Sequence, residues 1–237
     1  MDIAQRLQVV HERLRAAEHR FGRDPGSVKL LAVSKTQPVS AIRAALAAGQ
    51  HAFGENYLQE ALDKQQALAD TPAEWHFIGA LQSNKTREVA GHFDWCHTVD
   101  RLKIARRLSQ QRPEERPPLN VCIQVNISGE ASKAGVRPAG AAELAAQVAE
   151  LPRLRLRGLM ALPAPAEGLA AQRRPLAALR ELQEHLVSSG LALDTLSMGM
   201  SGDLEAAVAE GATLVRIGTA IFGPRQTTPA NGKENKR

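Results

Sequence analysis

Short apolar runs alternate with helix-forming segments along almost the whole chain, and this alternation constrains the fold more than any other feature. Eight runs have the length and apolar content of buried strands, at 28–33, 51–54, 75–78, 94–99, 119–126, 154–160, 195–198 and 213–217. Most are followed by helix formers, at 39–48, 57–69, 101–111, 141–150, 176–187 and 203–210, and residues 2–20 form a preceding amphipathic pattern. Strands that alternate with helices in this way predict parallel βαβ units.

Eight such units in a chain of 237 residues favour a single closed (β/α)8 barrel of the TIM type, with an extra N-terminal helix. An open doubly wound sheet is the alternative. Against it, the first strand is followed by Ser34, Lys35 and Thr36 and not by a glycine-rich dinucleotide turn. We expect one barrel domain over residues 1–225. Residues 226–237 are polar and lack periodicity, which predicts a disordered tail.

Composition argues against several classes of function. The N-terminus lacks a signal-peptide pattern, and no apolar stretch approaches the roughly 20 residues that span a bilayer, so we expect a cytoplasmic protein without membrane contact. The net charge is +5, but aromatic residues make up only 3%, which disfavours a nucleic-acid surface. Cys96 and Cys122 lie in apolar runs typical of buried thiols, and no Cys/His spacing indicates a metal site.

Polar residues follow the predicted strands at the ends where barrel enzymes carry their sites. Lys35 comes directly after the first strand. A partly buried amine can lose its proton and attack an aldehyde, which makes Lys35 a candidate nucleophile. An exposed lysine in a turn is the alternative interpretation.

Two glycine-containing segments near the end of the chain predict a phosphate site. They occupy residues 198–203 and 216–219, after the last two predicted strands. In barrels these two loops often bind phosphate through backbone N–H groups at the start of a helix. An ordinary helix capped by Ser201 is the alternative. Together with Lys35, the segments predict a phosphorylated aldehyde held as a Schiff base, and pyridoxal phosphate (PLP) is the leading candidate.

Three further side chains allow two interpretations each. Strand alternation places Arg216 inside the barrel, where it meets either a carboxylate or the ring nitrogen of a cofactor. His76 lies between two aromatic residues and is either a hydrogen-bonded core residue or part of the site. Asn56 either caps the helix expected from Tyr57 or faces the site.

Seven motifs, in this order, resemble those of the YggS/PROSC family of pyridoxal phosphate homeostasis proteins. They are AVSKT at 32–36, FGENY at 53–57, WHFIG at 75–79 with LQSNK at 81–85, VNISGE at 125–130 with KAG at 133–135, GLM at 158–160, SMGMSGD at 197–203 and RIGTAIFG at 216–223. The resemblance runs from the first helix to about residue 225.

The resemblance implies a barrel similar to that of bacterial alanine racemase, with PLP on Lys35. It implies phosphate contacts from Met200, Ser201, Gly218 and Thr219, a pyridine nitrogen facing Arg216, and a ring close to Asn56, His76 and Met160. Family members are regarded as cofactor carriers or regulators without established turnover. The resemblance therefore implies PLP storage or delivery, with PLP-dependent apoenzymes as recipients. We expect a monomer.

Two arguments from the residues favour a carrier over an enzyme. A two-base racemase with this barrel takes its second proton donor, a tyrosine, from an added β-domain, and the one tyrosine here, Tyr57, follows the second strand. An arginine at the ring nitrogen opposes protonation there, because like charges repel, and this weakens the ring as an electron sink. We expect no appreciable turnover; a weak PLP-dependent amino-acid racemase is the alternative.

Overall fold

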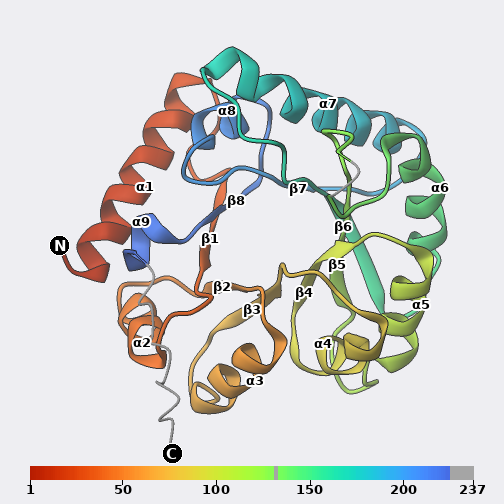
Figure 1. Ribbon diagram of the computed structural model, residues 1–237, viewed down its shortest axis with the longest axis horizontal. Helices are drawn as coiled ribbons and strands as arrows, with labels where there is room; N and C mark the ends of the chain where they lie inside the picture. Colours follow the sequence, from red (N-terminus) through yellow and green to blue (C-terminus); the bar gives the residue numbers. More distant parts are fainter. Residues whose placement is uncertain (131–132, 225–237) are drawn as a thin grey trace, which may run out of the picture.

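Eight parallel strands close into a barrel in the computed structural model of this chain, which describes residues 1–130 and 133–224 (Figure 1). The strands are β1 (Lys29–Val33), β2 (Ala52–Glu55), β3 (Glu74–Phe77), β4 (Trp95–Val99), β5 (Leu119–Gln124), β6 (Leu154–Met160), β7 (Thr195–Ser197) and β8 (Leu214–Ile217). Each strand pairs with its neighbour in chain order, and β8 pairs with β1 to close the ring. The predicted (β/α)8 barrel is confirmed.

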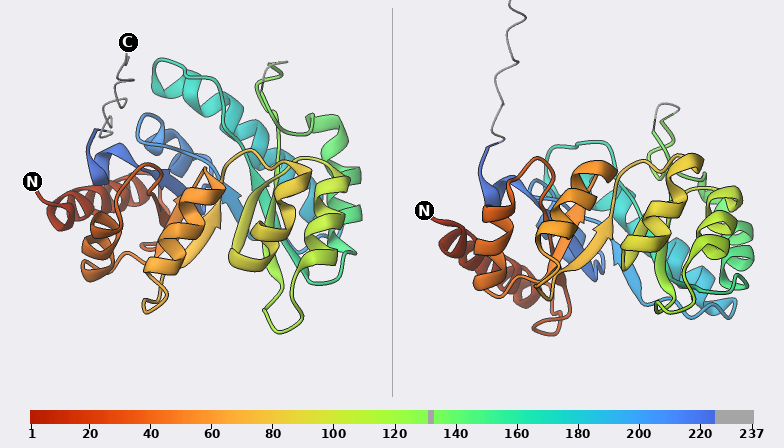
Figure 2. Two further views of the ribbon diagram at one scale, coloured as in Figure 1. Left: turned by 60° about the horizontal axis from the view of Figure 1, so that its bottom comes forward. Right: turned by 90° about the horizontal axis from the view of Figure 1, so that it is seen from below.

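Helices surround the strands, as the two side views of Figure 2 also show. They are α1 (Ile3–Arg20), α2 (Val39–Ala47), α3 (Leu58–Ala67), α4 (Thr86–His92), α5 (Leu102–Gln111), α6 (Pro138–Ala149), α7 (Leu169–Ser188), α8 (Leu204–Ala209) and α9 (Thr219–Phe222), with a 3-10 turn, η1 (Ser83–Lys85), before α4. The main apolar core lies between the strands and this ring of helices, and it includes Ile42, Phe53 and Leu108, all fully buried. The expected tail at 226–237 lies outside the described residues.

The extra N-terminal helix is present and packs on the outside of the ring. Asp2 accepts a hydrogen bond from the backbone of Gln5 at 2.8 Å, and the Gln5 side chain accepts one from the backbone of Asp2 at 3.1 Å, which forms a capping box. Leu7, Val10 and Leu14 make a buried stripe along one face. Through such packing α1 contacts α2, α8 and α9 (Figure 1).

Three helices differ from the sequence-based expectation. Helix α7 begins at Leu169 and not at 176, because the helix accommodates Pro175, a residue that usually marks a helix end. Helices α4 and α9 were not predicted. They have seven and four residues, which is too short for an apolar period to be recognised in a window of about 11–18 residues.

The interior of the barrel holds little apolar material. Two small clusters fill part of it, one around Leu31 and Ile78 and one formed by Trp95, Cys122 and Met160. Cys96 and Cys122 are buried free thiols, as expected, and burial raises the pKa of Cys96 to about 11. Buried polar side chains also lie there, among them His76, His97, Ser197 and Arg216. The barrel has two mouths, one at the carboxyl ends of the strands and one at their amino ends.

Candidate functional site

A cavity of about 440 Å³ opens at the carboxyl-terminal mouth of the barrel. This volume lies in the range of about 300–1,000 Å³ that is usual for small-molecule sites. All the predicted site residues except His76 line it. The complete lining is Val33, Lys35, Asn56, Ile78, Met160, Leu162, Met200, Ser201, Gly202, Arg216, Gly218 and Thr219.

A strained turn fixes the position of Lys35. The lysine is half-buried and follows β1, and the next residue, Thr36, has a φ of 62°. This left-handed conformation is unusual for a β-branched residue and costs about 1–3 kcal/mol. The backbone N–H of Thr36 donates to Glu60 of α3 at 2.5 Å, which helps to hold the turn.

A buried ionic cluster, here called the anchor cluster, holds the residues on both sides of Lys35. It consists of Ser34, Glu55, Glu60 and Lys64. The Lys64 ammonium donates to the Ser34 carbonyl at 2.7 Å, to Glu55 at 2.8 Å and to Glu60, and the Ser34 hydroxyl donates to Glu55 at 2.6 Å. Burial raises the pKa of Glu55, and Lys64 opposes that effect. The cluster therefore joins β1, β2 and α3 around Lys35.

The loop after β7 presents unused backbone donors to the cavity. The N–H groups of Ser201, Gly202 and Thr219 have no acceptor within the residues that the structure describes. Asp203, not Ser201, is the N-cap of α8, and it accepts from the Met200 N–H at 2.6 Å. The alternative of a helix capped by Ser201 is therefore wrong, and these amides remain available to an anion.

Helix α1 supports this loop from outside the barrel. Arg13 donates to the Ser201 carbonyl at 2.9 Å, and it forms two further hydrogen bonds with Glu205 of α8, at 2.7 and 2.6 Å. The paired guanidinium and carboxylate raise the pKa of Arg13 and lower that of Glu205. The bidentate contact gives the extra helix a role in positioning the site loop.

Arg216 is buried at the floor of the cavity, on the inner face of β8. It donates to the Ser197 hydroxyl at 2.7 Å and to the Ala161 carbonyl at 2.8 Å. No carboxylate within the described ranges forms an ion pair with it, so the first of its two predicted partners is not observed. Burial lowers the pKa of Arg216 to about 10.

Asn56 offers an unused acceptor at the same mouth. Its Oδ1 atom is buried and has no hydrogen-bond partner in the described part of the chain. The residue does not cap α3, because that helix begins at Leu58 with Tyr57 as its N-cap and has no side-chain cap. Close packing against its backbone requires glycine at position 79, where a Cβ would lie 2.1 Å from the Asn56 carbonyl oxygen. Buried acceptors are normally satisfied, so Asn56 fits a ligand that donates to it.

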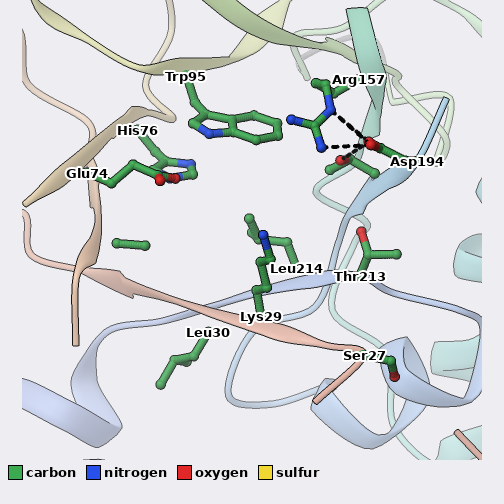
Figure 3. A pocket seen from close by; sticks show the side chains of 12 residues that line it. Ser27, Lys29, Leu30, Glu74, His76, Trp95, Arg157, Asp194, Thr213 and Leu214 are labelled. Carbon is green, nitrogen blue, oxygen red and sulfur yellow. Dashed lines mark hydrogen bonds and ion pairs between the residues drawn. The ribbon is translucent and has the colours of Figure 1, made fainter. Parts of the chain in front are cut away.

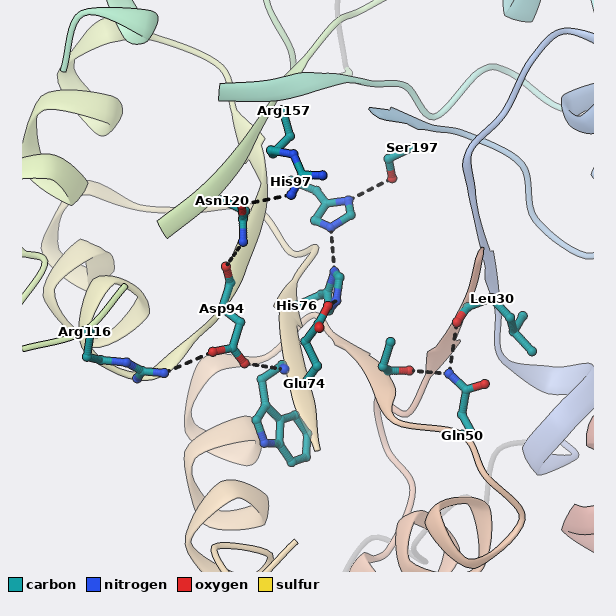
Figure 4. Close-up of polar contacts among 12 residues, drawn as sticks. Leu30, Gln50, Glu74, His76, Asp94, His97, Arg116, Asn120, Arg157 and Ser197 are labelled. Carbon is teal, nitrogen blue, oxygen red and sulfur yellow. Dashed lines mark hydrogen bonds and ion pairs between the residues drawn. The ribbon is translucent and has the colours of Figure 1, made fainter. Parts of the chain in front are cut away.

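The structure does not bring His76 to this cavity. Side chains alternate between the two faces along β3, and Ile78, the residue that follows the strand, lines the cavity, whereas His76 does not. Its ring nitrogens contact His97 at 2.9 Å and Glu74 at 2.6 Å (Figure 4). His76 is therefore a hydrogen-bonded core residue that does not line the cavity, and its expected place near a cofactor ring stays a prediction.

A second cavity, of about 280 Å³, lies at the amino-terminal mouth (Figure 3). Sequence reasoning did not predict it. Lys29, Glu74 and Trp95, each the first residue of its strand, contribute to its wall. Arg157 stacks over the Trp95 ring, 4.8 Å from its centroid, and pairs with Asp194 at 2.7 Å.

His97 predicts an acid-sensitive stability. It is fully buried, and burial, followed by electrostatic interaction with His76 and Arg216, holds its pKa well below the usual value. In the unfolded chain a histidine takes up a proton below about pH 6.5, which the folded state excludes. The contribution of neutral His97 to the free energy of unfolding is therefore fully present above about pH 6.5 and is lost as the pH falls below it. From about pH 7.5 to 5.5 we expect the free energy of unfolding to decrease by about 1.4 kcal/mol from His97 alone, measured by urea denaturation.

A matched variant separates this contribution from other titrations. His97→Asn keeps a polar side chain but removes the titrating ring, so its decrease over the same pH interval should be smaller by about the same 1.4 kcal/mol. Identical pH dependence of the two proteins would contradict the assignment.

Several residues at the site were missed by sequence reasoning. Ile78 could have been found, because it lies two residues after His76 in the predicted strand 75–78 and therefore points to the same face. Glu60 and Lys64 have the i, i+4 spacing of an ordinary surface pair on a helix. The burial of Lys64 against the carbonyl of Ser34 depends on the packing of α3, which no local pattern reveals.

Two absences apply to residues 1–130 and 133–224. No helix there is both long and apolar enough to cross a membrane. No group of three or more His, Cys, Asp or Glu side chains in the same ranges could hold a metal ion.

Comparisons with known proteins agree with this geometry. The family model described as alanine racemase, N-terminal domain, matches residues 6–226. The pyridoxal phosphate homeostasis protein of Pseudomonas aeruginosa is 62% identical over 223 residues, which cover 94% of this chain and 96% of that protein. The protein of the same name from Escherichia coli K12 is 58% identical over 227 residues, covering 94% and 97%.

Solved structures agree as well. PipY of Synechococcus elongatus PCC7942 with PLP bound has 39% identity and a TM-score of 0.82, and the match covers 94% of this chain and all of that one. Alanine racemase from Corynebacterium glutamicum has 19% identity and a TM-score of 0.67, covering 96% of this chain and 63% of that chain. At that identity the second likeness concerns the fold alone.

Proposed function

The chain belongs to the YggS/PROSC family of pyridoxal phosphate homeostasis proteins, and on this premise we propose that it binds PLP as a Schiff base on Lys35 and stores or delivers it. One observation carries the proposal. Lys35 lines the same cavity as Ser201, Gly202 and Thr219, whose N–H groups have no acceptor among the described residues. An amine and a set of anion-binding amides in one cavity suit an aldehyde that carries a phosphate.

The remaining lining residues fit the rest of PLP. Gly218 and the Ser201 hydroxyl would add to the phosphate contacts, and Arg216 would face the pyridine nitrogen. The unsatisfied Oδ1 of Asn56 would accept from a polar group on the ring, and Met160 supplies apolar contact. PLP supplies an aldehyde for condensation with an amine and, in enzymes, an electron sink.

The composition of the cavity supports a carrier. Among its described lining residues, Lys35 and Arg216 are the titratable side chains. A two-base reaction needs a second group that can exchange a proton with the substrate, and arginine holds its proton. Tyr57, the single tyrosine of the sequence, is 52% exposed and does not line the cavity. We therefore propose no appreciable turnover of amino acids.

The wider role follows from the chemistry of a carrier. PLP-dependent apoenzymes are the proposed recipients, and the cytoplasm is the proposed compartment. We propose a monomer, because the large exposed apolar side chains of the described residues are few, and two of them, Leu162 and Met200, line the candidate cavity. The exposed side chains are Met1, Val9, Tyr57, Leu162, Val187 and Met200.

Borohydride trapping tests the proposal directly. Purified protein mixed with PLP should show a visible Schiff-base absorption band, and reduction followed by peptide mass mapping should place the phosphopyridoxyl group on Lys35. Label scattered over surface lysines, or no band, would contradict the assignment. In the same sample, α-deuterated amino acids should keep their label; rapid loss of deuterium would favour the racemase alternative.

A further inference from the structure

A continuous line of hydrogen bonds runs through the barrel interior from one mouth to the other. From the amino-terminal mouth it joins Glu74 to His76 at 2.6 Å and His76 to His97 at 2.9 Å. It continues from His97 to the Ser197 hydroxyl at 2.8 Å and ends with Arg216, which donates to that hydroxyl at 2.7 Å. Figure 4 shows the part of this line from His76 to Ser197. We call these five residues the interior chain.

The charges at the two ends give the interior chain one direction. An ionised carboxylate only accepts hydrogen bonds, so Glu74 requires a proton on His76 Nε2. In a neutral ring Nδ1 is then an acceptor, and it takes the proton of His97 Nε2. His97 Nδ1 must in turn accept from the Ser197 hydroxyl, whose oxygen accepts from Arg216. Arginine only donates, so the far end agrees with the direction that Glu74 imposes.

Because the interior chain is buried, the direction of its hydrogen bonds at one mouth can affect the residues at the other mouth. His76, His97, Ser197 and Arg216 are all buried, whereas the Glu74 side chain is 50% exposed in the second cavity (Figure 3). Buried hydrogen bonds polarise one another, and uncompensated charge is costly in such surroundings. Arg216 has no carboxylate partner within the described ranges, so the nearest negative charge in hydrogen-bonded connection with it is that of Glu74.

We propose that Glu74 is a positioning residue for the opposite mouth of the barrel. Through the interior chain it fixes the tautomers of His76 and His97 and holds the Ser197 hydroxyl as an acceptor for Arg216. Arg216 is thereby kept in one orientation at the floor of the carboxyl-terminal cavity. The effect on cofactor binding rests on the proposed function, whereas the tautomers do not depend on it.

The tautomers are measurable in the protein without cofactor. Nitrogen-15 NMR of histidine-labelled protein should show His76 and His97 neutral, with the proton on Nε2 and Nδ1 unprotonated. Single His76→Asn and His97→Asn variants assign the two signals. A proton on Nδ1 of either ring, or a doubly protonated ring near neutral pH, would overturn the proposal.

Substitution of Glu74 tests the link to the far mouth. Glu74→Gln keeps the size but introduces an amide that can donate or accept, so both histidines should become tautomer mixtures. PLP should then bind about tenfold more weakly, within the roughly 5–150-fold range of coupling between sites. Glu114→Gln, a carboxylate that is 90% exposed on the segment preceding β5, is the control and should change neither property. Unchanged tautomers and unchanged affinity in Glu74→Gln would refute the link.

A second variant distinguishes an effect carried by the interior chain from a local effect of the substitution at Glu74. Ser197→Ala removes one small hydroxyl in the middle of the interior chain. If the interior chain carries the effect, Ser197→Ala weakens PLP binding. The double variant Glu74→Gln with Ser197→Ala should then bind PLP no more weakly than the single variant with the lower affinity. Additive losses would overturn the proposal. Should the wild-type protein fail to bind PLP at all, the proposed function fails, and the tautomers still decide the inference.

Discussion

Replacing Lys35 with alanine is expected to abolish the Schiff-base absorption band and to weaken PLP binding by about 100-fold or more, which corresponds to about 2.7 kcal/mol. The variant removes the amine that would form the covalent bond. It leaves the amides of Ser201, Gly202 and Thr219, so residual binding through the phosphate should persist. Absorption spectra and equilibrium titration measure the two effects separately.

Two controls isolate the covalent contribution. Lys35→Arg keeps the positive charge, but a guanidinium holds its proton and does not form a Schiff base, so the band should again be lost. Lys103→Ala removes an exposed lysine from α5, which lines neither cavity, and should leave band and affinity unchanged. A band of normal intensity in Lys35→Ala would show that another lysine is the attachment point.

Replacing Lys64 with methionine is expected to destabilise the protein by about 3–5 kcal/mol, the usual result of removing one partner from a buried ion pair. The Lys64 side chain is 6% exposed and that of Glu55 is completely buried. Without the ammonium, Glu55 loses its counter-charge and the Ser34 carbonyl loses a donor. Urea denaturation of the two proteins at neutral pH gives the difference in the free energy of unfolding.

The controls for Lys64 distinguish lost packing from stranded charge. Lys103→Met removes an exposed lysine from α5 and should change the free energy of unfolding by no more than about 0.5 kcal/mol. The double variant Glu55→Gln with Lys64→Met removes both charges and should recover a large part of the loss, because a neutral pair needs no counter-ion. A loss in Lys64→Met as small as that in Lys103→Met would contradict the role assigned to the anchor cluster.

The barrel could be predicted because its signal is local and repeated. Each strand is a short apolar run, each is followed by helix formers, and parallel strands bring their carboxyl ends to one mouth. This rule placed Lys35 beside the segments at 198–203 and 216–219, although about 160 residues or more separate them along the chain. Family resemblance then implied that Asn56 and Met160 lie close to the cofactor ring, and both line the same cavity.

By itself, therefore, the sequence determined the eight-stranded barrel, the mouth that carries the site and the lysine at that mouth, because periodicity and strand order are properties of the chain. Only the tertiary structure decided how deeply each side chain is buried and which groups it contacts. It joined His76 to His97 outside the cavity lining, gave Arg216 a hydroxyl in place of a carboxylate and buried Lys64 against the carbonyl of Ser34, the neighbour of Lys35. These contacts join strands and helices that are distant in sequence. Their existence depends on the stagger of the strands and on side-chain packing, which no run of neighbouring residues encodes.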